Sequence, residues 1–338
     1  MMDDKFYPII DLHCDLLSHL AKEAHRLPGA LEDVESRCSL SALRKGNVKL
    51  QTMAIFTETS PNSLRQGMAQ ANVFKELKNI SHGAFTYVKT KQQLDELAAH
   101  TIGAIPAIEN ASSLCDERED LEIALKRLST IQHKIGKFAY VTLTWNTENR
   151  FGGGAATSIG LKPDGRRLID YLAEHSIAID FSHTSDPLAF EIFNYLDKAN
   201  LKVPLLDSHS NMRKIHPHFR NLSDEIAKEI LHRGGIIGMS FIKTFIGEEG
   251  MHRFTHHLAH LFALGGMKQV CFGADFFNEN DLSTAFKSPS GSFYKDFGDA
   301  SCYPSLLQIC KSHLFLSEDV LCDIAWNNVL SFLKSYYF

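Results

Sequence analysis

One repeated pattern limits the folds open to this chain: a short apolar, β-rich segment followed by a longer stretch with a helical pattern. Eight such segments occur in the 338 residues, at 7–13, 48–56, 101–109, 138–145, 176–183, 203–209, 235–241 and 269–276. Most are nearly continuous apolar runs, as expected of parallel strands that are covered on both faces. Strands that alternate with helices in this way predict parallel βαβ units.

The stretches between these segments have helix signals. Ser223 is a good N-cap, acidic residues follow it in the first turn, and Gly234 with its neighbouring glycine ends the pattern. Residues 252–264 and 305–313 also have a helical pattern. Eight βα units predict a closed (β/α)8 TIM barrel, with a large doubly wound sheet as the alternative. No linker divides residues 1–338, so we expect one domain, with a long polar loop after the last strand over about 277–300.

Composition excludes several classes of protein. The 44% hydrophobic and 22% charged residues are typical of soluble globular domains. A net charge of −5 and the lack of a Lys/Arg-rich run argue against nucleic-acid or membrane-surface partners. The apolar runs are far shorter than a membrane span, and MMDDKFYPII lacks the regions of a signal peptide. The seven cysteines are scattered and never form CxxC, so the expected location is the cytoplasm.

The last residues of the eight segments carry the candidate chemistry, because active sites of such barrels lie at the C-terminal strand ends. Five of the eight segments end in histidines or acids: His13 and Asp15, Glu109, His183, Asp207 with His209, and Asp275. The fourth segment ends in Trp145 and Asn146, which we expect to line a substrate site.

The first and third segments supply a nitrogen and carboxylates that suit a metal ion. His13 and Asp15 are two residues apart, so on a strand they would point the same way and aim both ligand atoms at one point. This donor pair suits a zinc-type ion. Glu109 ends a buried run, where a carboxylate is costly unless it is paired or bound to metal. A buried ion pair is therefore the alternative for Glu109.

The fifth and sixth segments carry histidines in matching contexts, DFSHT for His183 and LDSHS for His209. With the three ligands above, they make five. That is too many for one tetrahedral zinc with an open position, and it suits two ions that share a carboxylate. Asp275, in FGADF, could orient or deprotonate a metal-bound water; a helix N-cap is its alternative.

For three further features, Cys14, Asp11 and the triple glycine at 152–154, the sequence favours a structural role. Cys14 alternates with His13 and should point into the barrel–helix layer. Asp11 lies two residues before His13, so we expect it on the same face as the ligands, either supporting them through a hydrogen bond or as a polar core residue. The triple glycine at 152–154 lacks the context of a phosphate loop and is expected to give the loop backbone its freedom.

Taken in order, the motifs DLHCD, AIEN, LTWNTEN, DFSH, DSHSN, HFRNLSDE and GADF resemble those of the membrane dipeptidase family, peptidase M19. These are renal-dipeptidase-like metallopeptidases of the amidohydrolase superfamily. The resemblance runs from residue 9 to about residue 332, and His-x-Asp on the first strand is its sharpest mark. It implies a (β/α)8 barrel of the metal-dependent hydrolase type.

The resemblance also implies a binuclear zinc site. His13 and Asp15 would hold one ion, His183 and His209 would hold the other, and Glu109 would bridge them. Other divalent ions would accept the same donors.

Two further roles follow from the resemblance. Asp275 would be the acid/base that exchanges protons with the bridging water and the leaving amine. Asp275 and Glu109 would thus be the two catalytic residues. Arg220, in HFRNLSDE, would receive the free carboxylate of the substrate, a task that suits a fixed guanidinium fork. From the residues alone, Arg220 is better interpreted as a surface salt bridge near a helix N-terminus.

Two positions depart from the family pattern. The family often has Leu-Thr-His where this chain has Leu-Thr-Trp145, which removes a hydrogen-bond donor to the developing oxyanion. After the last strand, the family's Gly-Asp-Phe-Asp-Gly is Ala-Asp275-Phe-Phe-Asn here. The acid is kept and the loop after it differs, so we expect consequences for rate and substrate choice.

The leading prediction is a zinc-dependent dipeptidase that uses a metal-bridging water or hydroxide on a small dipeptide. One alternative keeps the site and changes the substrate to another small amide or a lactone. The other is a catalytically weak binding protein on the same barrel. Relatives are commonly dimers, so a homodimer is a further expectation.

Overall fold

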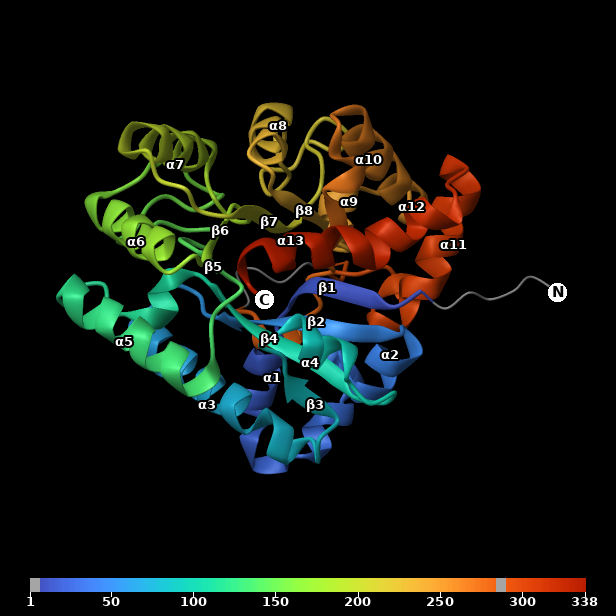
Figure 1. Cartoon of the computed structure of the whole chain (residues 1–338), viewed down its shortest axis with the longest axis horizontal. Helices are drawn as coiled ribbons and strands as arrows, with labels where there is room; N and C mark the ends of the chain where they lie inside the picture. The colour runs from blue at the N-terminus through green and yellow to red at the C-terminus, as the bar shows by residue number, and fades with distance from the viewer. Residues whose placement is uncertain (1–6, 284–289) are drawn as a thin grey trace.

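The computed structural model describes residues 7–283 and 290–338, and in them eight parallel strands close into a barrel (Figure 1). Its strands are β1 (Ile9–Cys14), β2 (Val48–Phe56), β4 (Ile102–Glu109), β5 (Tyr140–Thr142), β6 (Ala178–Asp180), β7 (Leu205–Ser210), β8 (Ile236–Met239) and β9 (Val270–Phe272). The ring closes because β9 pairs with β1 and β2 pairs with β4. The predicted (β/α)8 TIM barrel is therefore confirmed, and the doubly wound alternative is wrong.

A short strand outside the ring was not predicted. β3 (Phe85–Tyr87) pairs with the first half of β4, where Phe85 lies opposite Ile102. The second half of the same edge pairs with β5. Three residues are too few for a recognisable alternation, so the sequence offers no signal for this strand.

Several strands are shorter than the apolar segments that predicted them. The segments 138–145, 176–183 and 269–276 each form only three residues of ladder, in β5, β6 and β9. The chain leaves the ladder before His183 and Asp275, which have φ angles of 63° and 62°. A left-handed backbone cannot continue a strand, so these side chains stand on the turns that follow it.

Helices surround the barrel on its outer side, and α13 crosses one end of it (Figure 1). They are α1 (Leu16–Lys22), α2 (Leu40–Lys45), α3 (Ser63–Ile80), α4 (Lys91–Asp95), α5 (Leu121–Ile135), α6 (Pro163–Glu174), α7 (Asp186–Ala199), α8 (Asp224–His232), α9 (Lys243–Ile246), α10 (Met251–Ala263), α11 (Tyr303–Leu314), α12 (Glu318–Cys322) and α13 (Asn328–Tyr336). The predicted N-cap is confirmed, because Ser223 accepts a hydrogen bond from the Ile226 N–H. Helices α10 and α11 match the predicted segments 252–264 and 305–313. Within the described ranges, no helix combines the length and apolar character that crossing a membrane requires.

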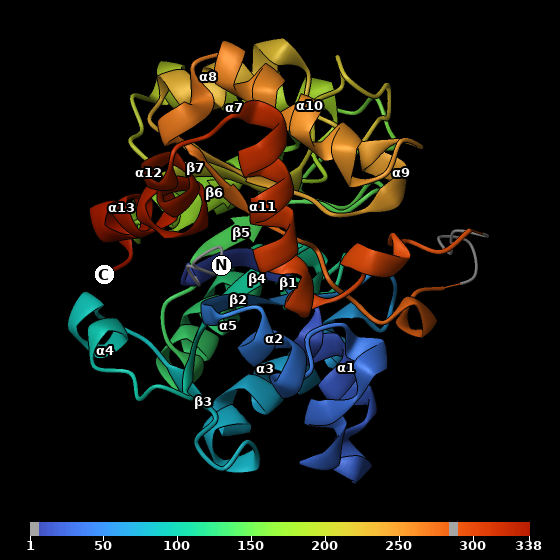
Figure 2. The ribbon, with the colours of Figure 1, turned by 90° about the vertical axis from the view of Figure 1, so that its right-hand side faces the viewer.

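The apolar core has two layers. The larger layer lies between the strands and the surrounding helices. The smaller one fills the barrel interior with residues such as Leu50 and Leu206, and Val329 and Leu333 of α13 pack against it. In Figure 2, α13 lies at one end of the molecule and the segment after β9 at the other. Helix α13 thus closes the end of the barrel opposite the C-terminal strand ends.

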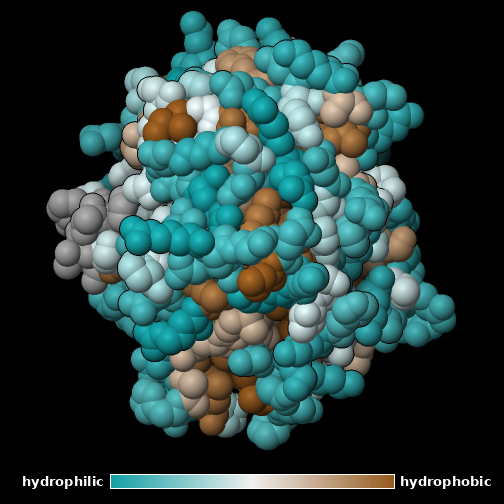
Figure 3. Space-filling model, turned by 90° about the vertical axis from the view of Figure 1, so that its left-hand side faces the viewer, coloured by the Kyte–Doolittle hydropathy of each residue, from teal (hydrophilic) through white to brown (hydrophobic). Residues whose placement is uncertain are grey.

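One face of the helix layer is visible in Figure 3, on the side of α5, α6 and α7. It is mostly hydrophilic, with small separate hydrophobic patches. Ile123 of α5 and Phe190 of α7 are among the exposed large hydrophobic residues. This distribution is ordinary for amphipathic helices that turn one face to the core.

The prediction for Asp11 was wrong about its direction. Its carboxylate accepts hydrogen bonds from the Tyr303 hydroxyl of α11 and from the Ala274 N–H, at 2.7 and 2.9 Å. It therefore reaches the helix layer, whereas His13 contacts the barrel interior. The pairing of β1 with β2 is irregular between Asp11 and Cys14, and this shift interrupts the alternation of side chains. Cys14 lies in the barrel–helix core, as predicted.

The predicted long loop over 277–300 contains short 3-10 turns in its described parts, at Glu279–Asp281, Lys295–Phe297 and Ala300–Cys302. Residues 284–289 of this loop lie outside the described residues.

Candidate metal centre and substrate pocket

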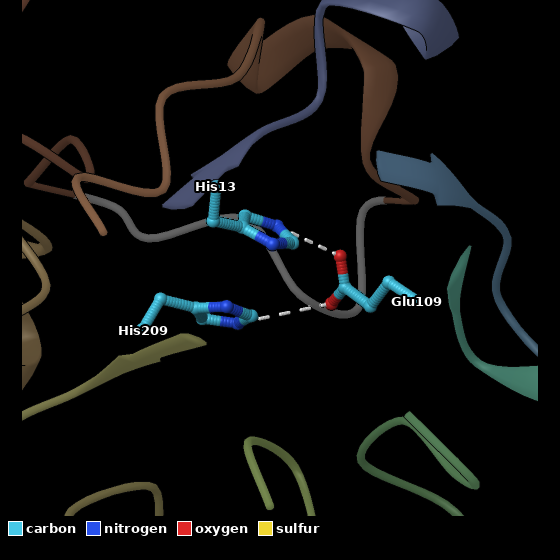
Figure 4. Close-up of side chains that lie close together, drawn as sticks. All are labelled: His13, Glu109 and His209. Atoms are coloured by element: carbon cyan, nitrogen blue, oxygen red, sulfur yellow. Dashed lines mark ion pairs between the residues drawn. The ribbon is translucent and has the colours of Figure 1, made fainter. Parts of the chain in front are cut away.

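The five predicted metal ligands meet at the C-terminal end of the barrel, around one carboxylate. Glu109 places Oε2 3.0 Å from His13 Nε2 and Oε1 2.9 Å from His183 Nε2. His209 Nε2 lies 3.9 Å from the same Oε1, and Figure 4 shows Glu109 facing both His13 and His209. Asp15 Oδ1 is 3.7 Å from His13 Nε2. Four strands thus bring these side chains to one place.

His13 is held with its Nε2 lone pair free. The Tyr140 hydroxyl donates its single proton to the Leu12 carbonyl, at 2.9 Å. The same oxygen lies 2.7 Å from His13 Nδ1, so it must accept a hydrogen bond from an Nδ1–H. The neutral ring then has its lone pair on Nε2, which faces Glu109. This is the tautomer that a metal ion requires.

The same reasoning applies to His183 and His209. The Oδ1 atom of Asn146 is an acceptor and lies 2.9 Å from His183 Nδ1, so that nitrogen carries the proton. Ser208 donates its hydroxyl proton to Asp180 at 2.7 Å and therefore accepts from His209 Nδ1–H, also at 2.7 Å. Both rings turn a bare Nε2 toward the centre.

These donor atoms fit a cation. The two bare nitrogens, His183 Nε2 and His209 Nε2, lie 2.9 Å apart, where facing lone pairs repel unless a cation binds them. Among the buried polar atoms of the described residues, His13 Nε2, Asp15 Oδ1 and Glu109 Oε2 have no hydrogen-bond partner. Buried polar groups without partners are rare, and a metal ion would satisfy all three.

The electrostatic environment favours the protonation states in which these side chains can bind a metal ion. Burial, followed by the nearby Arg220 charge, lowers the pKa of His183 to about 3, so this ring stays neutral. Burial also lowers the pKa of His209. For Glu109, burial alone would raise the pKa, but the neighbouring His13 and His183 hold it below its ordinary value. For His13, burial opposes protonation, but the Glu109 carboxylate beside it raises the pKa of the ring above its ordinary value. The centre therefore offers two neutral imidazoles, His183 and His209, and an ionised Glu109 carboxylate that His13 faces.

Asp275 borders this centre. Its Oδ1 lies 3.6 Å from His13 Nε2, and its N–H donates to the His13 carbonyl at 3.2 Å. Burial and the Glu109 charge raise the pKa of Asp275 to about 8, although His13 and Arg220 oppose the rise. The N-cap alternative is wrong, because the next helical turn is capped by Asn278. Its left-handed backbone costs about 1–2 kcal/mol, and such strain is typical of functional positions.

Arg220 lies in the pocket instead of at the surface. It is 4% exposed, and its Nη2 donates to the His209 carbonyl at 3.4 Å. Its Nε has no hydrogen-bond partner among the described residues, and the guanidinium stacks on the Phe245 ring at 5.2 Å. None of the ion pairs found between described residues involves Arg220. The interpretation of Arg220 as part of a surface salt bridge is therefore wrong. A buried and largely unpaired fork suits an incoming anion.

A pocket of about 400 Å³ opens beside these groups. Trp145 and Asn146 line it, together with Asp15, Glu109, His183, Arg220 and Asp275. The apolar part of its wall comes from Phe56, Phe219, Ile242, Phe245, Phe277 and Leu282. Its size suits a small ligand with one anionic end.

The triple glycine at 152–154 allows a close approach of two backbone segments. The expectation that it gives the loop conformational freedom was wrong. None of the three glycines has a positive φ angle. A Cβ atom on Gly154 would lie 1.9 Å from the Trp145 carbonyl oxygen, so only glycine allows this approach. The Ala155 N–H donates to that carbonyl at 3.3 Å. The glycine loop therefore packs against the backbone of Trp145 and holds it in place.

A family model described as membrane dipeptidase, peptidase family M19, matches residues 4–336 of this chain. The chain belongs to this family. It is accordingly a hydrolase of the metallo-dipeptidase type, and its family implies a metal cofactor. The resemblance inferred from the motifs is confirmed over almost the whole sequence.

Individual relatives agree with this membership of M19. An uncharacterized dipeptidase of Schizosaccharomyces pombe is 24% identical over 362 residues, which cover 97% of this chain and 81% of that protein. A metallo peptidase from Rhodobacter sphaeroides, solved with a phosphinate mimic of L-Ala-D-Ala, has a TM-score of 0.81 at 20% identity, covering 99% and 100% of the two chains. A second solved M19 dipeptidase has a TM-score of 0.80 at 19% identity, with 98% and 99% covered. At these identities the two structures support the fold alone.

Some residues of this M19 site were missed from the sequence. Tyr140, at the start of β5, and Ser208, between Asp207 and His209 on β7, orient two of the histidines through their hydroxyl groups. A tyrosine in a buried run is a weak indication of a polar contact nearby, because its buried hydroxyl needs a hydrogen-bond partner. The serine that precedes each histidine in DFSH and LDSH is another. Phe56 ends β2 without polar chemistry, so nothing in the sequence singled it out.

Proposed function

We propose that this M19 protein hydrolyses the peptide bond of dipeptides with two zinc ions. His13 and Asp15 would hold one ion, His183 and His209 the other, and Glu109 both. The observation that carries the proposal is the set of three imidazoles that are each oriented through Nδ1 and turn a bare Nε2 toward one carboxylate. When bound, the ions would supply a water molecule that ionises near neutral pH and would polarise the peptide carbonyl.

The protein's own groups would handle the protons and the substrate. Asp275 would take a proton from the attacking water on its carboxylate and pass it to the nitrogen of the leaving amine. Its raised pKa, about 8, suits a group that must hold and release a proton near neutral pH. Arg220 would bind the terminal carboxylate of the substrate through its guanidinium. Fixing the carboxylate next to the reacting bond would restrict the substrates to short peptides.

The two alternatives from the sequence receive less support. A lactone or a neutral amide would leave the buried guanidinium of Arg220 unpaired, which costs binding energy. A binding protein without catalysis gives no reason for the strained backbone that places Asp275 beside His13. The identity of the ions, a cytoplasmic location and a homodimer stay predictions.

Metal dependence is the first test. The purified protein is expected to contain about two zinc equivalents per chain and to hydrolyse at least one member of a dipeptide panel. A chelator should abolish the activity, and added zinc should restore it. Elemental analysis and a ninhydrin assay on the same preparation measure both. Hydrolysis that no chelator affects, or no hydrolysis of any dipeptide, would contradict the proposal.

Arg220→Ala tests the substrate class. Losing charge-assisted hydrogen bonds to a carboxylate costs about 1.5–3 kcal/mol, so kcat/KM for free dipeptides should fall roughly 10- to 150-fold. Dipeptides with an amidated C-terminus lack that carboxylate and should lose much less. Arg167→Ala is the matched control, because Arg167 is an exposed residue of α6 that pairs with Glu122. Unchanged turnover of free dipeptides would indicate a different amide or a lactone as substrate.

A further inference from the structure

The pocket has a rigid apolar wall directly beside the metal centre, made by Phe56 and Trp145. Their ring centroids are 5.3 Å apart, and the two residues are 8% and 5% exposed. Trp145 also stacks on His183 with a centroid distance of 5.9 Å and an interplanar angle of 30°. The wall therefore borders the place where the peptide bond would react.

The backbone on both sides holds this wall in position. Phe56 lies opposite Glu109 in the pairing of β2 with β4. Gln70 of α3 binds the Phe56 backbone twice: it accepts from the Phe56 N–H at 2.8 Å and donates to the Phe56 carbonyl at 2.6 Å. Gly154 packs against the Trp145 carbonyl. A preorganised wall loses little conformational entropy when a ligand side chain packs on it.

A second aromatic group lies around Arg220. The Arg220 guanidinium stacks on Phe245, and His218 contacts the rings of both Phe245 and Phe219, at centroid distances of 4.9 and 4.5 Å. If the substrate carboxylate binds Arg220, the C-terminal residue occupies this part of the pocket. The N-terminal residue then extends past Glu109 toward Phe56 and Trp145.

We propose that the substrates of this site are dipeptides whose N-terminal residue has a large apolar side chain, and that Trp145 determines this preference. The inference rests on the proposed dipeptidase function and names the substrate class within it. A leucine or phenylalanine side chain gains by leaving water to pack against the wall. A polar side chain of similar size would give up its hydrogen bonds to water, and glycine would leave the wall uncovered.

The test compares kcat/KM of the zinc-loaded protein for Leu-Ala, Phe-Ala, Asn-Ala and Gly-Ala. Leucine and asparagine are similar in size, so the ratio of kcat/KM for Leu-Ala to that for Asn-Ala measures the effect of polarity. The comparison with Gly-Ala measures the effect of removing the side chain. Leu-Ala and Phe-Ala are expected to exceed the other two by at least about tenfold. Trp145→Ala should reduce the Leu-Ala to Gly-Ala ratio to roughly threefold or less, whereas Trp145→Phe should retain most of it.

Phe190→Ala is the control, because Phe190 is an exposed residue of α7 outside the pocket lining, and it should leave the ratio unchanged. Circular dichroism checks folding; if Trp145→Ala is unfolded, Phe56→Ala makes the same comparison. Equal rates for all four dipeptides would overturn this inference and leave the dipeptidase proposal intact. A preference in the series Ala-Leu, Ala-Asn and Ala-Gly that Trp145→Ala removes would overturn the assignment to the N-terminal residue. No hydrolysis at all would overturn the dipeptidase proposal itself.

Discussion

Glu109→Gln is expected to remove at least one bound metal ion per chain and to lower kcat/KM by more than about 100-fold. Replacing a residue that only orients a metal ligand costs about 10- to 100-fold, so a carboxylate shared between two ions should cost more. The two carboxylate oxygens face different histidines, at 3.0 Å from His13 and 2.9 Å from His183. Glutamine has the same shape but offers one acceptor oxygen and an NH₂ group that cannot bind a cation.

The measurement pairs elemental analysis with steady-state kinetics on the same preparation of the Glu109→Gln variant. Glu122→Gln is the matched control: Glu122 is an exposed residue at the start of α5 that pairs with Arg167. A full complement of metal in Glu109→Gln would refute the bridging role. Full metal together with unchanged kcat/KM would also remove Glu109 from the catalytic machinery.

Asp275→Asn is expected to lower kcat by about 10²- to 10⁴-fold, the usual contribution of a general acid or base. Asparagine keeps the size of the side chain but can neither take a proton from water nor give one to the leaving amine. We expect KM to change little, since Asp275 acts on the reacting atoms and Arg220 on the carboxylate. Asp197→Asn on α7 serves as the control, because Asp197 forms an exposed pair with Arg233.

Metal content distinguishes two possible roles of Asp275. The ligand atoms of His13, Asp15 and Asp275 all lie within 4.8 Å of one another, so Asp275 is also within reach of an ion at that point. Two metal equivalents retained in Asp275→Asn would support the role of proton carrier. Loss of one equivalent would instead make Asp275 a ligand, and a wild-type kcat would exclude both roles.

The barrel and the positions of its candidate metal ligands could be predicted because both depend on local, periodic features. Apolar runs of strand length that alternate with helical stretches indicate βαβ units, and parallel strands bring their C-terminal ends to one edge. His13, Glu109, His183 and His209 each follow such a run. Their convergence therefore needed no knowledge of individual contacts.

What orients these side chains depends on contacts across the closed ring. Tyr140 reaches His13 from a strand 127 residues away in sequence, and Asn146 reaches His183 from the loop after β5. Asp11 and His13 point to different sides because the pairing of β1 with β2 is irregular between Asp11 and Cys14, and a shift of register leaves no mark in a single strand's pattern.

The pocket residues also differ in how far the sequence could predict them. In the sequence, Arg220 had no feature to separate it from a surface arginine except the resemblance of its motif, and Phe56 had none. The sequence by itself determined the strand periodicity, the barrel and the residues at its open end. Only the tertiary structure decided that Arg220 is buried, that Phe56 and Trp145 form one wall, and which nitrogen of each histidine faces the centre. Burial and hydrogen-bond partners arise where separate segments pack together, and local sequence does not specify that packing.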